Sequence, residues 1–315
     1  MLVWINGQIV PAHEARVSVF DRGFLFGDGV YELVRFFNGV GVQMDDHVAR
    51  LARSLAHARI QGVEAAALPA IATSLLGAGG LRDATLYLQV TRGAAATRAH
   101  LPPAGIAPTV VAMASASPSL EEFTQPEPVH AVLLEDLRWK RCDIKSISLM
   151  GNILALLGAA DADGDEAILH CDGLVSEGTA TNVFALIGST LVTPPIDSDP
   201  VILHGVTRLA VFDAARDLGL RVEVRPLRVA ELRGAGEIMV TSSRRIVAPV
   251  TSLDGALVGT GTAGPIAQAL FGCARRAIAV RSGVALDPPP IDSRHSATAP
   301  VAAFPPVVPQ SVARR

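Results

Sequence analysis

The sequence predicts a mixed α/β protein made of two folded units. Strand-like runs of alternating apolar and polar residues recur along the chain, together with helical patterns in which apolar residues fall at i, i+3 and i+7. A chain of 315 residues can hold two substantial cores. A stretch rich in Ser, Pro and Glu separates the two sets of elements. We expect a small first unit over residues 1–117, a linker over 118–128, a larger second unit over 129–283 and a tail over 284–315.

Composition excludes several classes of protein. Half of the residues are hydrophobic, which excludes a disordered chain, although the tail is rich in Pro, Ala, Val and Ser without periodicity and is expected to be disordered or extended. The net charge of -3 and the scattered arginines argue against nucleic acid as a partner, so small molecules are expected. No apolar run approaches the roughly 20 residues of a membrane span, and the first residues lack a signal-peptide layout. We therefore expect a cytoplasmic protein without a membrane partner.

The three cysteines are an odd number at wide spacings. This arrangement is typical of reduced thiols, and it offers no metal-ligand pattern. No metal site is expected.

The first unit is predicted to open with a β-hairpin, because Asn6-Gly7 lies between two apolar runs. A glycine-rich loop over residues 21–30 then leads into an alternating strand that carries Tyr31 on one face. Asn38-Gly39 turns this strand into another over residues 40–44. The glycines do not match the G-x-G-x-x-G dinucleotide loop, so a Rossmann fold is not predicted.

A helix is predicted after residue 45, with His47 and Arg50 near its first turn. Arg50 lies off the apolar stripe, which fits either a solvated arginine or an anion ligand. After a second helix near residues 69–76 and a strand over 85–92, a long loop carries Arg98 and His100. This loop is either a mobile surface segment or a clamp for a carboxylate, since a guanidinium binds a carboxylate through two hydrogen bonds. A strand over residues 109–114 closes the unit.

Lys145 is the candidate catalytic residue of the second unit. It follows a strand over residues 129–137 and is itself expected in a strand, beside the apolar residues Ile144 and Ile147. An ammonium buried among apolar groups is disfavoured in its charged form, which makes the amine a candidate nucleophile for a carbonyl. The alternative is an ordinary lysine whose head group lies in water. A helix over residues 152–162 is predicted next.

Later segments of the second unit offer a carboxylate and two anion sites. Glu177 lies in a predicted turn between strands 166–170 and 181–187, where it could face a cleft. Gly205 precedes a helix through residue 218 with Thr207 as the expected N-cap, and such a helix start can bind phosphate. The strand over 237–240 ends in the cluster Thr241-Ser242-Ser243-Arg244, and a last helix is predicted over 264–279. A nucleophilic lysine, a carboxylate and two phosphate clusters are together what pyridoxal phosphate chemistry needs.

Seven stretches resemble the fold type IV pyridoxal phosphate enzymes, and among them most closely the D-amino acid aminotransferases. They are the glycine-rich stretch over residues 21–32, His47-Val-Ala-Arg50-Leu, Gln89-Val-Thr-Arg-Gly, Arg98-Ala-His100, the stretch over 138–146, the stretch over 177–184, and Gly205-Val-Thr207-Arg. These motifs occur in the family's order at near-constant spacing, from about residue 3 to residue 279. The resemblance implies a small α/β domain, a linker and a larger domain with a β-barrel-like core, with the cofactor between the domains.

The resemblance also implies roles for single residues. Lys145 would form the Schiff base with pyridoxal 5'-phosphate and then shuttle a proton, Glu177 would pair with the pyridine nitrogen, and Leu203 would pack against the ring. The implied phosphate contacts are Arg50, Val206, Thr207, Ser242 and Ser243. The substrate carboxylate would be held by Tyr31, Arg98 and His100, the last two reaching across from the other subunit of a homodimer. His47 would lie behind these contacts.

The expected activity is transfer of the amino group of a D-amino acid, such as D-alanine, to a 2-oxo acid, such as 2-oxoglutarate, by a ping-pong mechanism. Alternatives of the same fold are a branched-chain L-amino acid aminotransferase, an (R)-amine transaminase and an aminodeoxychorismate lyase. A protein that binds the cofactor without turnover is the non-enzymatic alternative. The chain departs from the close relatives' pattern at Ala180, within Thr-Ala-Thr where they carry three serines, and at Lys140, where an apolar residue is usual. We expect both departures to affect substrate preference.

Overall fold

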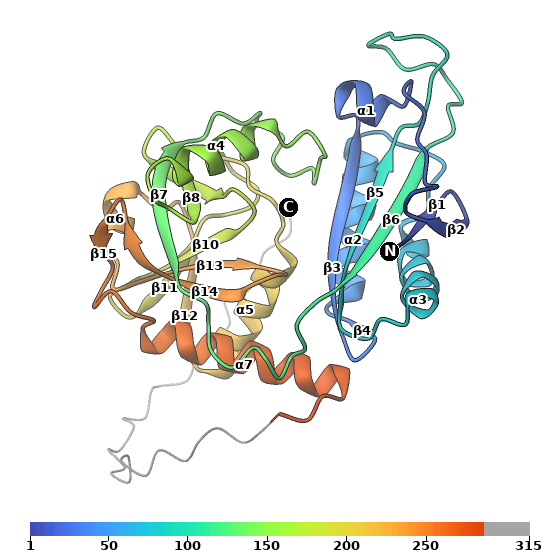
Figure 1. Cartoon of the computed structure of the whole chain (residues 1–315). Coiled ribbons are helices and arrows are strands. Elements are labelled where there is room, and N and C mark those ends of the chain that lie inside the picture. Colours follow the sequence, from blue (N-terminus) through green and yellow to red (C-terminus); the bar gives the residue numbers. More distant parts are fainter. Residues whose placement is uncertain (287–315) are drawn as a thin grey trace, which may run out of the picture. The chain divides into compact units, whose positions relative to one another are not determined.

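The structure is a computed structural model, and it describes residues 1–286 (Figure 1). Met1–Ala285 form one compact unit that contains two β-sheets with helices packed on them. The predicted tail lies almost entirely outside the described residues. The helices are α1 (Arg22–Phe26), α2 (Met44–His57), α3 (Leu68–Gly79), α4 (Met150–Ala160), α5 (Val206–Asp217), α6 (Val229–Arg233) and α7 (Pro265–Ser282).

The N-terminal sheet is antiparallel throughout, in the order β2-β1-β6-β5-β3-β4. Its strands are β1 (Leu2–Ile5), β2 (Gln8–Pro11), β3 (Gly29–Phe37), β4 (Val40–Gly41), β5 (Ala84–Thr91) and β6 (Thr109–Ala116). The predicted opening hairpin is confirmed, with Asn6 and Gly7 both at positive φ in the turn. This geometry is what makes Asn-Gly a strong hairpin signal.

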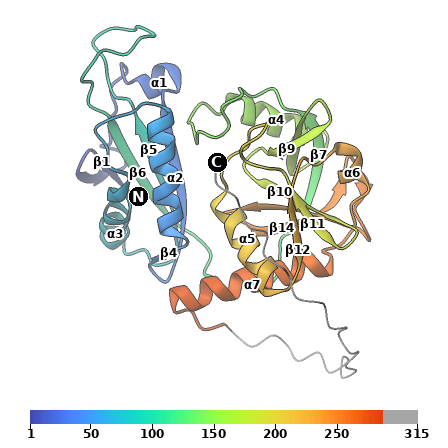
Figure 2. The same ribbon diagram turned by 180° about the vertical axis from the view of Figure 1, so that it is seen from behind.

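One face of the N-terminal sheet is buried under α2 and α3 (Figure 1 and Figure 2). Val30 and Val34 of β3 pack into this core, because every second side chain of a strand points to the same face. The same alternation turns Tyr31 and Leu33 to the opposite face, where both line a cavity. The register of β3 therefore decides which of its residues belong to the core and which to the cavity.

The C-terminal sheet has nine strands and mixes parallel with antiparallel pairs. Along the sheet the order is β12-β11-β10-β13-β14-β7-β8-β9, with β15 beside β14, and β9 also contacts β10, so that the sheet curls back on itself. Its strands are β7 (Val129–Glu135), β8 (Glu166–Cys171), β9 (Leu174–Gly178), β10 (Asn182–Ile187), β11 (Thr190–Thr193), β12 (Arg221–Val224), β13 (Glu237–Ser242), β14 (Ile246–Leu253) and β15 (Ala256–Leu257). The expected mixed α/β fold with a curled, barrel-like second sheet is confirmed.

Helices cover the C-terminal sheet in separate places. α5 and α7 pack on each other and on β13 and β14, around a core that includes Phe184 and Phe271. α4 packs on β7 and β8 through Ala159, which is its only buried residue. Most of α4 is therefore left on the surface, although it is rich in Leu and Ile.

Four sequence-based expectations about local structure are wrong. The strand after Asn38-Gly39 ends at Gly41, because Gln43 takes a left-handed conformation (φ 50) and α2 begins at Met44. Lys145 lies in an irregular segment between β7 and α4 instead of a strand. Glu177 lies within β9 and not in a turn. Gly205, and not Thr207, is the N-cap residue of α5.

Within residues 1–286, none of the helices combines the length and the hydrophobicity that crossing a bilayer requires.

Candidate active site

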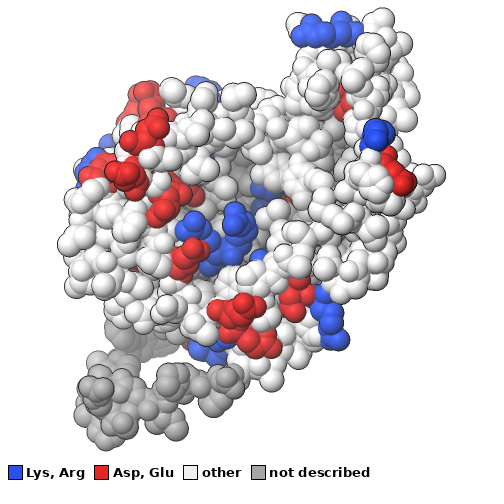
Figure 3. All heavy atoms as spheres, in the orientation of Figure 1, with Lys and Arg blue, Asp and Glu red and all other residues white. Residues whose placement is uncertain are grey.

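A cavity of about 410 Å³ is lined by residues from both sheets. A hollow with basic side chains gathered in it is visible on one face of the molecule (Figure 3). The volume suits a small cofactor or substrate, since ligand sites commonly measure about 300–1,000 Å³. The sequence-predicted residues that line the cavity are Tyr31, Arg50, Lys145, Glu177, Leu203, Val206, Thr207, Ser242 and Ser243.

Lys145 is held in place by its backbone. Its carbonyl accepts a hydrogen bond of 2.9 Å from the amide of Tyr31, and its own amide donates to Ser54 Oγ at 3.2 Å. Ser146 then forms an isolated β-bridge with Val30. The segment is thereby tied to the edge of β3 and to α2, which gives an irregular stretch of chain a defined position.

The side chain of Lys145 extends over an aromatic ring. Its Nζ atom lies 4.2 Å from the centroid of the Tyr31 ring, within the range of a cation–π contact. No carboxylate pairs with this amine within residues 1–286. Lys140 is the only other lysine in the chain, and it is exposed and does not line the cavity. The expectation that Lys140 affects substrate preference therefore gains no support from the lining of this cavity.

Arg50 is buried and paired, not solvated. Its Nε and Nη2 atoms donate to the two carboxylate oxygens of Glu32 at 2.8 and 2.7 Å, and its Nη1 atom donates to the carbonyl of His204 at 3.2 Å. Burial would raise the pKa of Glu32, but the charge and hydrogen bonds of Arg50, together with His47, outweigh it and hold the pKa at about 2. Such a paired guanidinium is held at one orientation.

His47 contacts the far side of this ion pair. Its Nδ1 atom lies 2.6 Å from Glu32 Oε2, and it is almost fully buried behind Arg50. Burial lowers the pKa of His47, against the opposing effect of Glu32. The residue does not line the main cavity and lies behind Arg50, which does.

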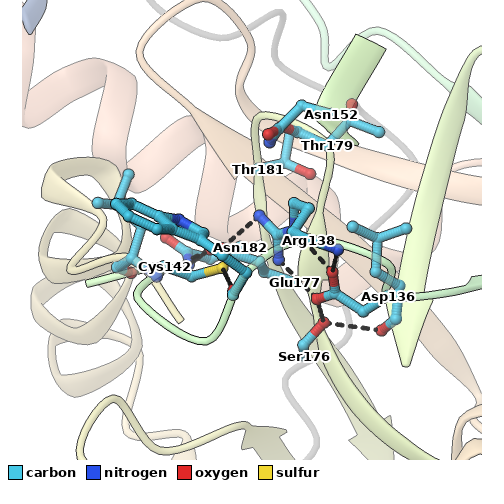
Figure 4. A network of polar contacts seen from close by, with 12 residues as sticks. Asp136, Arg138, Cys142, Asn152, Ser176, Glu177, Thr179, Thr181 and Asn182 are labelled. Atoms are coloured by element: carbon cyan, nitrogen blue, oxygen red, sulfur yellow. Dashed lines mark hydrogen bonds and ion pairs between the residues drawn. The ribbon is translucent and has the colours of Figure 1, made fainter. Parts of the chain in front are cut away.

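Glu177 lies at the centre of a polar network on the other wall (Figure 4). Its Oε1 atom accepts a hydrogen bond from Arg138 Nη1 at 2.9 Å, and Arg138 also binds Asp136 through Nε and Nη2. Ser176 Oγ donates to Asp136 at 2.8 Å. Burial raises the pKa of Glu177 even against the charge of Arg138, so a cationic group brought into the cavity beside this carboxylate would stabilise it.

The second oxygen of Glu177 is held by Asn182 and by the amide of Leu203. Asn182 Nδ2 donates to Glu177 Oε2 at 3.2 Å and to the carbonyl of Leu203 at 3.1 Å, and the Leu203 amide donates to Glu177 Oε2 at 3.1 Å. Gly205 follows closely, and a Cβ atom there would lie 1.7 Å from Asn182 Oδ1. The glycine is needed because the chain passes so close to Asn182.

An anion cradle forms where α5 begins. Gly205 provides no side-chain cap, so the amides of Val206 and Thr207 remain available at the positive end of the helix dipole. Ser242 and Ser243 lie at the adjacent end of β13 and line the same cavity. The Oγ1 atom of Thr241 is buried in the cavity wall and has no hydrogen-bond partner among residues 1–286. An unpaired buried hydroxyl in the same cavity as free helix amides fits a bound phosphate group.

Glu166 is a site residue that the sequence reasoning missed. Its buried carboxylate lines the cavity and accepts hydrogen bonds from the amide of Thr179 at 2.9 Å, the hydroxyl of Thr181 at 3.0 Å and the hydroxyl of Thr179. The Thr-Ala-Thr departure therefore keeps two hydroxyls on this carboxylate, whereas Ala180 lines the cavity without one. The signal in the sequence was an acidic residue that begins an otherwise apolar strand.

Arg138 and Asp136 were also missed as site residues. Their spacing of two residues places both on one side of an extended chain, which is the signal that could have been used. The sequence alone contains no sign that Glu177, about 40 positions later, would be their partner.

Like His47, the predicted substrate contacts Arg98 and His100 do not line the cavity. Both are exposed, and both contact Phe26: the Arg98 guanidinium lies 4.9 Å from its ring centroid and the His100 ring packs edge-on at 5.6 Å. Arg22 holds the loop by donating to the carbonyls of Ala99 and His100 at 2.6 and 2.8 Å. The two side chains are thus presented together on the surface of α1 and its loop.

Comparison with known proteins identifies the family to which this chain is similar. Residues 29–253 match the model of the family described as amino-transferase class IV. The chain is 39% identical over 269 residues to a D-alanine aminotransferase from Bacillus licheniformis, an alignment that covers 85% of this chain and 94% of the relative. It is 36% identical over 272 residues to a D-alanine aminotransferase from Listeria innocua, which covers 86% of this chain and 93% of that one.

Among solved structures, the chain is similar to a branched-chain aminotransferase from the archaeon Thermoproteus uzoniensis with norvaline. The TM-score is 0.79 at 25% sequence identity, covering 90% of this chain and 95% of the other. The family model spans more than half of the chain, and the two D-alanine aminotransferases match it over most of their length. The chain therefore belongs to the class IV aminotransferase family.

Proposed function

We propose that this chain is a pyridoxal 5'-phosphate-dependent transaminase that moves the amino group of a D-amino acid, such as D-alanine, to a 2-oxo acid, such as 2-oxoglutarate. The observation that carries the proposal is the placement of Lys145, whose amine has no carboxylate partner within the described residues, in the same cavity as the buried Glu177. The names of the two relatives at 39% and 36% identity support the D-amino acid as donor.

When bound, pyridoxal phosphate supplies a carbonyl that takes up the amino group and a ring that draws electrons from the substrate. Lys145 would hold the cofactor through this carbonyl, and its amine would serve as the base that carries a proton to and from the substrate α-carbon. The Tyr31 ring beneath its Nζ atom and the Ser54 hydroxyl on its amide keep the amine in position. A positioned base of this kind typically contributes a rate factor of about 10²–10⁴.

The remaining cavity residues hold the cofactor. Arg50, the amides of Val206 and Thr207, and the hydroxyls of Ser242 and Ser243 would bind the phosphate, because they line the same cavity as the Thr241 hydroxyl and supply hydrogen-bond donors. Glu177 would pair with the protonated pyridine nitrogen, and this positive charge would offset the burial that raises the pKa of Glu177. Leu203 packs against the ring.

The substrate carboxylate is held by Tyr31 together with Arg98 and His100 of a second copy of the chain. Arg98 and His100 are exposed and lie outside the cavity of their own chain, so they can serve a neighbouring one. The surface of α4 supports a homodimer, since Ile153, Leu154 and Leu157 are each more than half exposed beside the cavity residue Leu156. Contiguous apolar surface of this kind favours a protein partner. The cytoplasmic location stays a prediction.

A coupled assay with separate enantiomers tests the function. We expect purified enzyme to consume D-alanine in the presence of 2-oxoglutarate and to leave L-alanine unchanged. Consumption of L-leucine but not of D-alanine would refute the proposal. That outcome would favour the branched-chain L-amino acid aminotransferase, which the similarity to the solved structure from Thermoproteus uzoniensis keeps as the second candidate.

A further inference from the structure

Five cationic side chains line the cavity, and three of them already have a role. Arg50 is neutralised by Glu32, and Arg138 by Asp136 and Glu177. Lys145 is the proposed catalytic amine. The remaining two cations are Arg244 and Arg245, which follow Ser243 in the turn between β13 and β14.

Neither arginine has a close carboxylate partner within residues 1–286. Arg244 forms no ion pair there, and Arg245 Nε lies 3.9 Å from the exposed carboxylate of Glu127, which is at the limit of an ion pair. Exposed pairs of this kind contribute little. The acidic residues of the cavity are engaged elsewhere: Asp165 accepts from the amide of His130, while Glu166 and Glu177 bind their own donors. Two guanidinium groups are therefore available to an anion that enters the cavity.

The turn that carries these arginines has a specific backbone conformation. Ser242 pairs with Ile246 across the hairpin, and Ile246 adopts a left-handed conformation with φ 60 while its side chain is buried. A β-branched residue rarely adopts this conformation, and it is retained only where the surroundings enforce it. The Ser242 hydroxyl also accepts from the Arg245 amide at 3.3 Å. The arginines thus project from a constrained hairpin at the cavity wall.

We propose that Arg244 and Arg245 form a subsite for a second carboxylate, so that the enzyme prefers dicarboxylic amino acids and 2-oxo acids. This inference rests on the proposed function, in which Tyr31, Arg98 and His100 hold the α-carboxylate and leave the side chain of the substrate to be recognised. A guanidinium binds a carboxylate through two parallel hydrogen bonds, and a monocarboxylic substrate such as D-alanine has no group to accept them. The cradle at α5 and Arg50 already serve the phosphate, which leaves this pair for the substrate.

The test compares D-glutamate with D-alanine in the first half of the reaction, so that no acceptor is needed. The cofactor-loaded enzyme is mixed with either amino acid, and the absorbance of the cofactor gives kcat/KM for each. In the double variant Arg244→Gln/Arg245→Gln we expect the ratio of D-glutamate to D-alanine kcat/KM to fall by about tenfold or more. Arg276→Gln, an exposed arginine of α7 outside the cavity, is the matched control and should leave the ratio unchanged. Arg244→Lys/Arg245→Lys should restore part of the ratio.

An unchanged ratio in the double glutamine variant would overturn the inference. Equal losses for both substrates, together with release of the cofactor on gel filtration, would show that the arginines hold the phosphate, and would also overturn it. If the unmodified enzyme converted only L-amino acids, the proposed D-specificity would fail by itself. The same ratio measured with L-glutamate and L-alanine would then decide the role of the two arginines.

Discussion

Lys145 and Tyr31 make two contacts, one through the backbone and one through the side chains. The Tyr31 amide donates to the Lys145 carbonyl at 2.9 Å, and the Lys145 Nζ atom lies 4.2 Å from the centroid of the Tyr31 ring. One contact places the backbone of the lysine and the other places its side chain. A residue of the N-terminal sheet thereby positions the amine of a segment that precedes α4, far later in the chain.

Lys145→Ala should reduce transamination by about 10²–10⁴-fold or more, because the variant loses the base that moves the proton. It should also lose the absorbance of lysine-linked cofactor. Only two lysines exist in the chain, so borohydride reduction followed by peptide mass spectrometry should place the cofactor on Lys145 alone. Lys140→Ala is the control and should retain both the label and the activity. Full activity in Lys145→Ala would refute the mechanism.

Arg98→Ala should raise KM for amino acids by roughly ten- to a hundredfold, with little change in cofactor affinity, because a charge-assisted hydrogen bond to the substrate is lost. Steady-state kinetics and cofactor titration give the two quantities. Arg16→Ala, also an exposed arginine outside the cavity, is the control. Equal losses in both quantities would argue against a substrate clamp.

Mixed dimers test whether Arg98 acts across subunits. Inactive Lys145→Ala protein mixed with Arg98→Ala protein should regain activity at low substrate concentration. Each mixed dimer would combine Lys145 of one chain with Arg98 of the other in one intact site. If Arg98 serves its own chain, both sites of the mixed dimer stay defective and no gain appears.

Stability should depend on the Glu32–Arg50 pair in acid. The pKa of Glu32 is lowered from 4.5 to about 2, so its contribution is fully present above pH 4.5 and is lost as the pH falls through about 2. The contribution is on the order of a few kcal/mol. Denaturant unfolding from pH 6 to pH 2 should show a smaller pH dependence in Glu32→Gln than in the unmodified protein. Glu231→Gln removes a more exposed ion pair with Arg225 and should change the dependence little.

Gly205→Ala should weaken cofactor binding by about tenfold, as measured by titration. The new Cβ atom would lie 1.7 Å from Asn182 Oδ1, so Asn182 must move and give up its hydrogen bonds to Glu177 and Leu203. Gly77→Ala is the matched control, since nothing apart from the neighbouring backbone of α3 lies within 4 Å of its added Cβ. That change should leave binding intact and stabilise the helix by about 0.5–1 kcal/mol. Unchanged affinity in Gly205→Ala would show that the Asn182 contacts do not support the site.

Local chemistry in the sequence was sufficient for much of the fold. The Asn6-Gly7 hairpin and the alternation of β3 follow from turn geometry and side-chain period, which depend on neighbours in the chain. The motifs around Lys145, Glu177 and Gly205 likewise pointed to the family, because their residue types and order are themselves the signal. At Gln43 and Lys145 the local signals were ambiguous, and the strands predicted there were wrong. Contacts with distant segments determine the backbone conformation at such positions.

Only the tertiary structure decided which groups the buried charged side chains pair with. The sequence left two interpretations of Arg50, a solvated residue or an anion ligand. Its burial against Glu32 depends on the packing of α2 on β3. No local pattern in the sequence relates Arg138 to Glu177, or Glu166 to Thr179 and Thr181. Nor does a local pattern place Arg244 and Arg245 in the cavity wall. A sequence determines which chemical groups are available and how nearby residues turn. The partner of a buried charge is set by the packing of whole elements, because that packing decides which groups leave water together.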